Sequence, residues 1–254
     1  MTRPVALVTG TSRRRGIAAA VARRLARDGY DLVLHSWAPF DAEMPWHADE
    51  GGAKAVAAEC RELGAVVTEL AGDFADPAEP QRVLDAVHAG HGGLDALAAV
   101  HARSSPYPLA EATAAELDLC FAVNVRSIVL LAKAYAARDG DRPGRLVTFT
   151  SGQYHEGMPD EIPYAVSKGA VHQMTATLAR SLAPRRITVN CVDPGPCDTG
   201  WASEETYAAV AARMPDGTWT APADVAAAVS WLFGPDGSRV TGQVVAVDGG
   251  WSTT

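Results

Sequence analysis

Positive charge and long apolar runs are scarce in this chain. Its 254 residues include 22 Lys and Arg against 30 Asp and Glu, a net charge of −8, and no basic tail or stripe can be traced. A nucleic-acid partner is therefore not expected. No apolar run approaches the roughly 18 residues that a membrane-spanning helix needs, and no charged-then-apolar leader opens the sequence. We expect no membrane contact and a cytoplasmic location.

Cysteine is also sparse and unpatterned. The four cysteines, Cys60, Cys120, Cys191 and Cys197, form no C-x-x-C pair and stand at no histidine spacing typical of zinc. A metal site is therefore not expected. The thiols are expected to be reduced, as in the cytosol.

Short aliphatic or β-branched runs alternate with alanine-rich stretches of helical character along the chain. This alternation is typical of strand–helix–strand units around a parallel sheet. The length suits one hydrophobic core and no linker or repeat interrupts it, so residues 1–254 are expected to form a single domain. The sequence predicts an α/β fold, a single doubly wound Rossmann domain with a seven-stranded parallel sheet flanked by helices.

The expected strands cover residues 5–9, 31–36, 66–71, 94–100, 145–150, 187–192 and 244–247. The expected helices cover residues 17–28, 53–63, 81–89, 113 to about 138, 164–182 and 224–233, with a weak helix at 204–213. Irregular segments at 35–52 and 193–220 leave strands at their carboxyl ends. Because doubly wound sheets bind ligands at that edge, both segments are candidate walls of a site.

The first strand runs into a glycine-punctuated turn before a helix. Such a turn presents backbone N–H groups at the positive end of a helix dipole, where a pyrophosphate can bind. The residues expected at this contact are Gly10, Ser12, Arg13, Arg14, Gly16 and Ile17. A glycine turn before a helix is common, so the motif alone is weak evidence for a nucleotide site.

Tyr164 and Lys168 stand four residues apart, and Tyr164 follows Ser151 by 13 residues. On a helix this spacing puts the ammonium group on the same face as the phenol. A positive neighbour favours the phenolate, so such a tyrosine can exchange a proton with a carbonyl or alcohol oxygen. A polar pair on a helix surface is the plainer alternative, and the glycine turn and Ser151 weigh against it.

Together these residues resemble the short-chain dehydrogenase/reductase family over essentially the whole chain. Further positions that match the family are Asn124, Asp73-Phe74, Pro194-Gly195, Thr199, Gly242-Gln243 and Asp248-Gly249-Gly250. The resemblance implies hydride transfer between a nicotinamide cofactor and a small-molecule carbonyl or alcohol, with 3-oxoacyl thioesters as the foremost substrate class. It also implies a homotetramer or homodimer, and a segment at 197–220 that closes over the substrate.

The resemblance also assigns roles to single residues. Tyr164 would be the acid/base, Ser151 would hydrogen-bond the substrate oxygen, and Lys168 would also hold the nicotinamide ribose. Asn124 would anchor a water of a proton relay. The cofactor contacts that it adds are Asp73, Phe74, Pro194, Gly195 and Thr199. Plainer roles stay open, because Asn124 could be a buried polar residue, and Ser151 or Thr199 only a turn residue.

The sequence departs from the family pattern at two places. The glycine turn holds two more residues between its glycines than the family's Thr-Gly-x-x-x-Gly-x-Gly, and Ala18 replaces the last glycine. After the fourth strand, Ala99-Val100-His101-Ala102 replaces Asn-Asn-Ala-Gly, so the polar contacts that brace the sheet and the adenosine ribose are expected to be missing. His101 is expected to be an ordinary loop histidine that substitutes for them at most in part.

The cofactor type depends on the end of the second strand, where an acid would bind the ribose 2′-hydroxyl and repel a 2′-phosphate. This chain has His35-Ser36-Trp37 there, without a carboxylate, and Arg13-Arg14-Arg15 in the turn opposite. Arginine matches a phosphate with two parallel hydrogen bonds. We expect NADP(H) rather than NAD(H), although Asp41 or Glu43 could fold back onto the ribose.

Three other functions compete with ketone reduction by NADPH. An NAD-dependent alcohol dehydrogenase would use the same residues in the oxidative direction. An enoyl reductase shares the wide glycine turn and the alanine at Ala18, but typically has a longer tyrosine–lysine spacing. A catalytically idle nucleotide-binding or regulatory protein could share the fold, because fold does not fix function. The complete set of Ser151, Tyr164 and Lys168 argues against this last alternative.

Overall fold

The computed structural model describes residues 3–137 and 142–253. Within them, seven parallel strands form one sheet in the order β3-β2-β1-β4-β5-β6-β7. The strands are β1 (Val5–Thr9), β2 (Asp31–Ser36), β3 (Val67–Ala71), β4 (Ala96–Ala99), β5 (Gly144–Phe149), β6 (Ile187–Asp193) and β7 (Val244–Ala246). The predicted doubly wound α/β fold with a seven-stranded parallel sheet is therefore confirmed.

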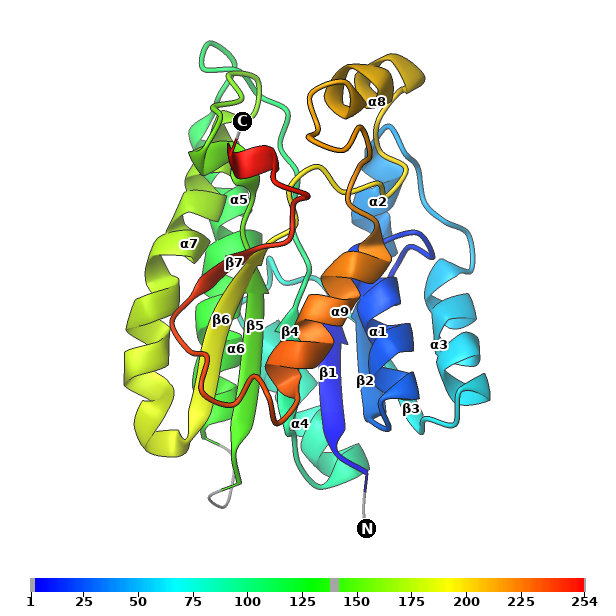
Figure 1. Cartoon of the computed structure of the whole chain (residues 1–254). Helices are drawn as coiled ribbons and strands as arrows, with labels where there is room; N and C mark the ends of the chain where they lie inside the picture. Colours follow the sequence, from blue (N-terminus) through cyan, green and yellow to red (C-terminus); the bar gives the residue numbers. More distant parts are fainter. Residues whose placement is uncertain (1–2, 138–141, 254) are drawn as a thin grey trace.

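Helices cover both faces of this sheet (Figure 1). One face carries α1 (Ile17–Arg27), α3 (Gly52–Glu62) and α9 (Pro222–Phe233), and the other carries α4 (Glu79–His91), α6 (Ser127–Ala136) and α7 (Ile162–Leu182). No helix in the described ranges is long and apolar enough to cross a membrane.

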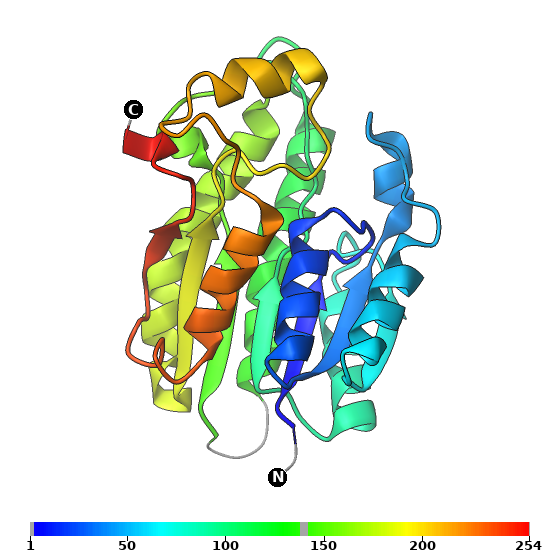
Figure 2. The same cartoon turned by 45° about the vertical axis from the view of Figure 1, so that its right-hand side comes forward.

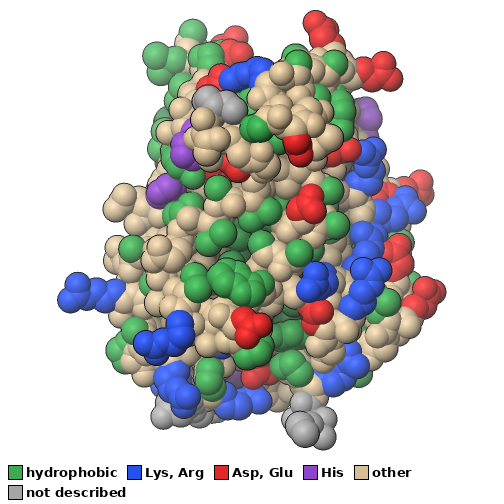
Figure 3. Space-filling model, viewed as in Figure 1, with side chains coloured by type: hydrophobic (Ala, Val, Ile, Leu, Met, Phe, Trp, Pro, Cys, Tyr) green, Lys and Arg blue, Asp and Glu red, His purple; other side chains and the backbone are tan. Residues whose placement is uncertain are grey.

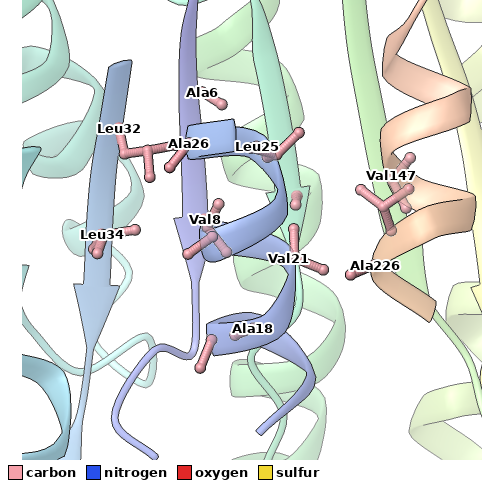
Figure 4. Packing of buried hydrophobic residues seen from close by; sticks show 14 of the residues in the cluster. Ala6, Val8, Ala18, Val21, Leu25, Ala26, Leu32, Leu34, Val147 and Ala226 are labelled. Atoms are coloured by element: carbon pink, nitrogen blue, oxygen red, sulfur yellow. The ribbon is translucent and has the colours of Figure 1, made fainter. Parts of the chain in front are cut away.

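Small side chains let α1 lie close to the sheet. Ala18, Ala22 and Ala26 are almost completely buried against β1 and its neighbours. Val21 of α1 lies beside Ala226 of α9, so α1 packs against this neighbouring helix as well as against the sheet (Figure 4). A methyl group therefore fits where the family has a third glycine, and the close helix–strand packing survives the change.

The helix predicted from residue 113 is interrupted by a wider turn. It comprises α5 (Ala114–Phe121), one π-helical turn (Ala122–Arg126) and α6, and its predicted end near residue 138 lies outside the described residues. Thr113 caps α5, because its hydroxyl oxygen accepts the N–H of Glu116 at 3.2 Å. The Glu116 carboxylate forms no capping box with Thr113, and pairs instead with Arg103 at 3.0 Å.

The irregular segment after β2 contains a short helix that the sequence did not predict. This helix, α2 (Ala38–Glu43), has a proline in its first turn, where a missing N–H costs nothing. The predicted weak helix in the second irregular segment is present as α8 (Glu204–Ala211), capped by Ser203. Both α2 and α8 lie beyond the carboxyl edge of the sheet (Figures 1 and 2).

The order of the strands reverses next to β1. The chain runs outward from β1 through β2 to β3, then returns to β4 on the other side of β1 and continues to β7. The connections on the two sides leave in opposite directions, which opens a crevice at the carboxyl ends of β1 and β4. Doubly wound sheets bind their ligands at this point.

Candidate active site

A cavity of about 560 Å³ lies beyond the carboxyl edge of the sheet and reaches from the glycine turn to Tyr164. Its walls come from the glycine turn, α2, the loops after β3, β4, β5 and β6, and α7. The predicted site residues that line it are Gly10, Ser12, Arg13, Gly16, Ile17, His35, Trp37, Asp73, Phe74, Ser151, Tyr164, Lys168, Pro194, Gly195 and Thr199. Arg14, Ser36 and Asn124 are not among the lining residues.

The glycine turn is shaped to receive a phosphate. Gly10 has φ +83, and a Cβ there would lie 2.9 Å from the Cα of His101, so only glycine fits. The carbonyl of His35 holds the turn by accepting the N–H groups of Gly10 and Thr11 at 2.8 and 3.0 Å. Gly16 precedes α1 without a capping side chain. The first-turn amides of α1 are therefore left to a ligand, and these residues fit a nicotinamide dinucleotide.

The three arginines of this turn have different surroundings. Arg13 faces the cavity, where its guanidinium donates to the carbonyl of Thr199 at 2.8 Å and lies 5.1 Å from the ring centre of Trp46. Arg14 forms an ion pair with Asp49, and Arg15 pairs with Asp198 at 3.0 Å. Of the three, Arg13 alone presents its charge to the cavity.

Two histidines sandwich the ring of Phe74 under the cavity. The ring centres of His35 and Phe74 are 4.2 Å apart, and those of Phe74 and His101 are also 4.2 Å apart. His35 is 1% exposed and its Nε2 lies 3.2 Å from Glu79. His35 was predicted to be among the cofactor-binding residues and lines the cavity, while its side chain is buried in the protein. It supports Phe74 and, through its carbonyl, the glycine turn.

His101 is buried and hydrogen-bonded through both ring nitrogens, unlike the ordinary loop histidine expected from the sequence. It is 9% exposed, with Nδ1 2.6 Å from the hydroxyl of Thr9 and Nε2 2.8 Å from that of Ser127. The Ser127 hydroxyl donates to the carbonyl of Val123 at 2.5 Å, so Nε2–H must donate to Ser127 while Nδ1 accepts from Thr9. Burial lowers the pKa of His101 to about 3. A neutral imidazole thus joins β1 to the π turn.

Tyr164, Lys168 and Ser151 meet at the substrate end of the cavity. The Lys168 ammonium lies 5.6 Å from the ring centre of Tyr164 and donates to the carbonyl of Phe149 at 2.8 Å. Burial raises the pKa of Tyr164, and the hydrogen bond with Ser151 acts in the opposite direction. Burial also lowers the pKa of Lys168 to about 8. The expected acidification of Tyr164 by Lys168 is therefore outweighed by desolvation of the phenol.

Asn124 lies behind the cavity wall, inside the π turn. Its carbonyl oxygen accepts the N–H of Arg103 at 2.7 Å, and its amide donates to the carbonyl of Arg103 and to Ser167, both at 2.9 Å. Ser167 in turn donates to the carbonyl of Tyr164 at 2.7 Å. Asn124 therefore fixes the loop after β4 to the start of α7, through hydrogen bonds to backbone and side chain.

Further residues around the cavity were not among the predicted site residues. Arg103 borders it, paired with Glu116 and stacked 5.4 Å from the ring centre of Phe40 in α2. Each of two aromatic rings is thus in contact with a cation. Arg103 of the loop after β4 lies over Phe40, and Arg13 of the glycine turn lies over Trp46. Only the unusual aromatic content of residues 37–46 could have indicated this role.

The segment after β6 forms an aromatic cluster at the far end of the cavity. Trp219 stacks on Tyr207 with ring centres 4.9 Å apart and contacts Trp201 at 5.7 Å. Trp201 and Trp219 line the cavity, whereas Met214 is buried beneath them. No group of three or more potential metal ligands occurs among the residues that the structure describes.

Comparisons with known proteins agree with this geometry. The sequence model of a family described as "Enoyl-(Acyl carrier protein) reductase" matches residues 10–252. The 3-oxoacyl-acyl-carrier-protein reductase FabG of Aggregatibacter actinomycetemcomitans is 33% identical over 249 residues, which cover 96% of this chain and 97% of that protein. A short-chain dehydrogenase from Burkholderia cenocepacia, solved in complex with NADP, is 35% identical with a TM-score of 0.86, over 98% of this chain and 97% of that one.

A blue fluorescent protein from a metagenomic library, solved in complex with NADPH, is 33% identical with a TM-score of 0.87, over 98% of this chain and 97% of that chain. The family match and these relatives each span nearly all of the chain. On the evidence of the sheet, the cavity and these matches, the protein belongs to the short-chain dehydrogenase/reductase family of oxidoreductases.

Proposed function

We propose that this protein uses NADPH to reduce a ketone to a secondary alcohol. The observation that carries the proposal is that Ser151, Tyr164 and Lys168 line the same cavity as the open first turn of α1. A proton donor and a dinucleotide site therefore share one enclosed space. A catalytically idle protein would have no need of this arrangement. The four-residue spacing of Tyr164 and Lys168 favours a ketone over an enoyl substrate.

The residues divide the chemistry among them. NADPH, when bound, supplies the hydride. Tyr164, whose raised pKa keeps it protonated at neutral pH, gives its proton to the carbonyl oxygen as charge develops there. Ser151 donates a hydrogen bond to the same oxygen, and Lys168 holds the nicotinamide ribose and stabilises the phenolate that remains. The oxidative direction would use the same groups in reverse.

Large apolar side chains favour a bulky ketone. Leu119, Met158, Trp201, Trp219 and Trp251 all line the cavity. Apolar walls of this size bind alkyl or aryl groups and keep water from the reacting carbonyl. A 3-oxoacyl thioester meets this description, and a relative that covers almost the whole chain carries that activity in its name.

The proposed reaction can be tested directly with purified protein. With NADPH present, loss of cofactor absorbance should depend on an added ketone, and 3-oxoacyl thioesters, aryl ketones and enoyl thioesters should be compared. We expect faster turnover of ketones than of enoyl thioesters. NADPH binding without turnover of any of the three would indicate the idle nucleotide-binding alternative, and a preference for the enoyl group would reassign the reaction.

Arg13 should determine the preference for NADPH over NADH. Arg13→Ala removes the cavity-facing charge that a 2′-phosphate would meet, and should weaken NADPH binding about 10- to 100-fold relative to NADH. Arg14→Ala is the matched control, because Arg14 is paired with Asp49 outside the cavity and should leave the ratio unchanged. Fluorescence titration measures both affinities. Tighter binding of NADH by the native protein would contradict the assignment and point to Asp41, which also borders the cavity.

We also propose that the protein associates into a homodimer or homotetramer. Leu117 and Phe121 of α5, Val129 of α6 and Val166 of α7 are large apolar side chains that remain exposed on one side of the subunit. Exposed apolar side chains gathered on neighbouring helices indicate a protein–protein contact. Light scattering during gel filtration should give at least twice the mass of 26.6 kDa expected for one chain, and a monomer would refute the proposal.

A further inference from the structure

Glu161 places a carboxyl group next to the proposed acid. It is the residue before α7, one helical turn ahead of Tyr164, and both side chains line the cavity. Burial and, after it, the negative charge of Glu161 raise the pKa of Tyr164. A carboxylate at this point opposes formation of the phenolate. Its presence there calls for a role.

Glu161 has no cationic partner. Among residues 3–137 and 142–253, no Lys, Arg or His lies within ion-pair distance of it, whereas Glu156 at the same end of the cavity is paired with Arg213. Within the described ranges, the only side chain that donates to Glu161 is Gln153, whose Nε2 lies 2.5 Å away. Burial raises the pKa of the Glu161 carboxyl. A half-buried carboxyl without a cation is uncommon outside functional sites.

The amide of Gln153 leaves a second acceptor unused. Its Oε1 is buried and accepts no hydrogen bond, while its Nε2 is directed to Glu161. That oxygen has almost no exposed surface and cannot contact a molecule in the cavity, so Glu161 is the acceptor that this pair offers to a ligand, and Gln153 holds it in place.

The neighbouring aromatic and apolar side chains of this wall offer Glu161 no donor. The indole N–H groups of Trp201 and Trp219 donate to the backbone carbonyls of Cys197 and Tyr207. Leu119 and Met158 carry no donor. Acidic side chains also predominate over basic ones at the end of the molecule that carries α8 (Figure 3). A donor on the bound molecule can therefore pair with the Glu161 carboxylate.

We infer that Glu161, held in place by Gln153, forms a subsite that binds a hydrogen-bond donor, a hydroxyl or an ammonium group, carried by the substrate close to its ketone. The inference rests on the proposed ketone reduction and narrows its substrate class. A donor on the carbon next to the carbonyl reaches Glu161 while Tyr164 holds the carbonyl oxygen. A carboxylate in the same position would face a second negative charge and be rejected.

The test uses four aryl ketones that differ in one group: acetophenone, phenacyl alcohol, protonated phenacylamine and benzoylformate. With saturating NADPH, the native protein should show kcat/KM for phenacyl alcohol or phenacylamine about tenfold or more above that for acetophenone, since a hydrogen bond to a charged group is worth more than 1 kcal/mol. Benzoylformate should be the poorest substrate. Glu161→Leu should bring the donor-to-acetophenone ratio close to one.

Two variants separate the carboxylate from general damage. Glu161→Gln should keep the preference for phenacyl alcohol and lose that for phenacylamine, because an amide accepts a hydrogen bond without a charge. Asp160→Asn, at the neighbouring exposed residue outside the cavity, should keep both ratios. The subsite alone is overturned if the native protein reduces acetophenone with the same kcat/KM as the two donor ketones. It is also overturned if the donor-to-acetophenone ratio is unchanged in Glu161→Leu. A protein that reduces none of the four overturns the proposed function and the subsite with it.

Discussion

Replacing Tyr164 by phenylalanine should reduce kcat for ketone reduction by about 10²- to 10⁴-fold, which is the usual contribution of a positioned general acid. The ring stays, so the wall of the cavity and its packing against Lys168 are kept. Only the transferable proton is lost. The measurement is the initial rate of NADPH consumption with a ketone that the native protein reduces, at a saturating concentration of cofactor.

Cofactor affinity provides the control for this variant. NADPH binding by Tyr164→Phe should stay within a few-fold of the native value, because the phosphate contacts lie at the other end of the cavity. Near-native turnover would mean that another group is the acid. Tyr154 is a poor candidate, since it does not line the cavity.

Removing the side chain of His101 should lower the free energy of unfolding by about 3 kcal/mol. The variant His101→Ala leaves a space beside Phe74 and takes a buried hydrogen-bond partner from both Thr9 and Ser127. Urea unfolding followed by circular dichroism measures the loss. NADPH affinity should fall as well, since Gly10 packs on the backbone at His101.

Two variants are controls for this prediction: one replaces a different histidine, and the other places a different side chain at position 101. His88→Ala, on a half-buried histidine of α4, should change stability by much less. His101→Asn should recover part of the loss, because an amide can both accept from Thr9 and donate to Ser127. Equal stability of His101→Ala and the native protein would show that the observed contacts do not hold the fold together.

The same histidine gives the native protein a pH dependence with a defined sign. The folded-state pKa of His101 is lowered to about 3 from 6.5, so the stability it contributes is present above about pH 6.5 and is lost as pH falls toward 3. Between pH 7 and pH 5 this loss amounts to about 2 kcal/mol. His101→Asn should lose correspondingly less over this range. An identical decline in both proteins would assign the acid sensitivity to other groups.

Local sequence patterns determined the architecture. Short β-branched runs bounded by turns gave all seven strands within two residues of their observed bounds, because a buried parallel strand is apolar throughout. The glycines at 10 and 16 marked the phosphate turn, since Gly10 can be replaced by no residue with a Cβ. The spacing of Tyr164 and Lys168 indicated the helix face, because residues four apart are neighbours on a helix.

What the sequence could not decide was the environment of each polar side chain. His101 and His35 look alike in the sequence, as polar residues at strand ends, and only the packing of Phe74 between them shows that both support the site. The three successive arginines look equivalent in the sequence. Two of them form ion pairs with residues distant in sequence, Asp49 and Asp198, and Arg13 faces the cavity.

Periodicity and turn chemistry act between residues a few positions apart, so the sequence by itself determined the strands, the order of helices, the glycine turn and the Ser151–Tyr164–Lys168 set. Burial, ion pairing and pKa depend on groups brought together from distant parts of the chain. The tertiary structure alone therefore decided that the pKa of Tyr164 is raised, that His101 is neutral, and that Glu161 lines the cavity.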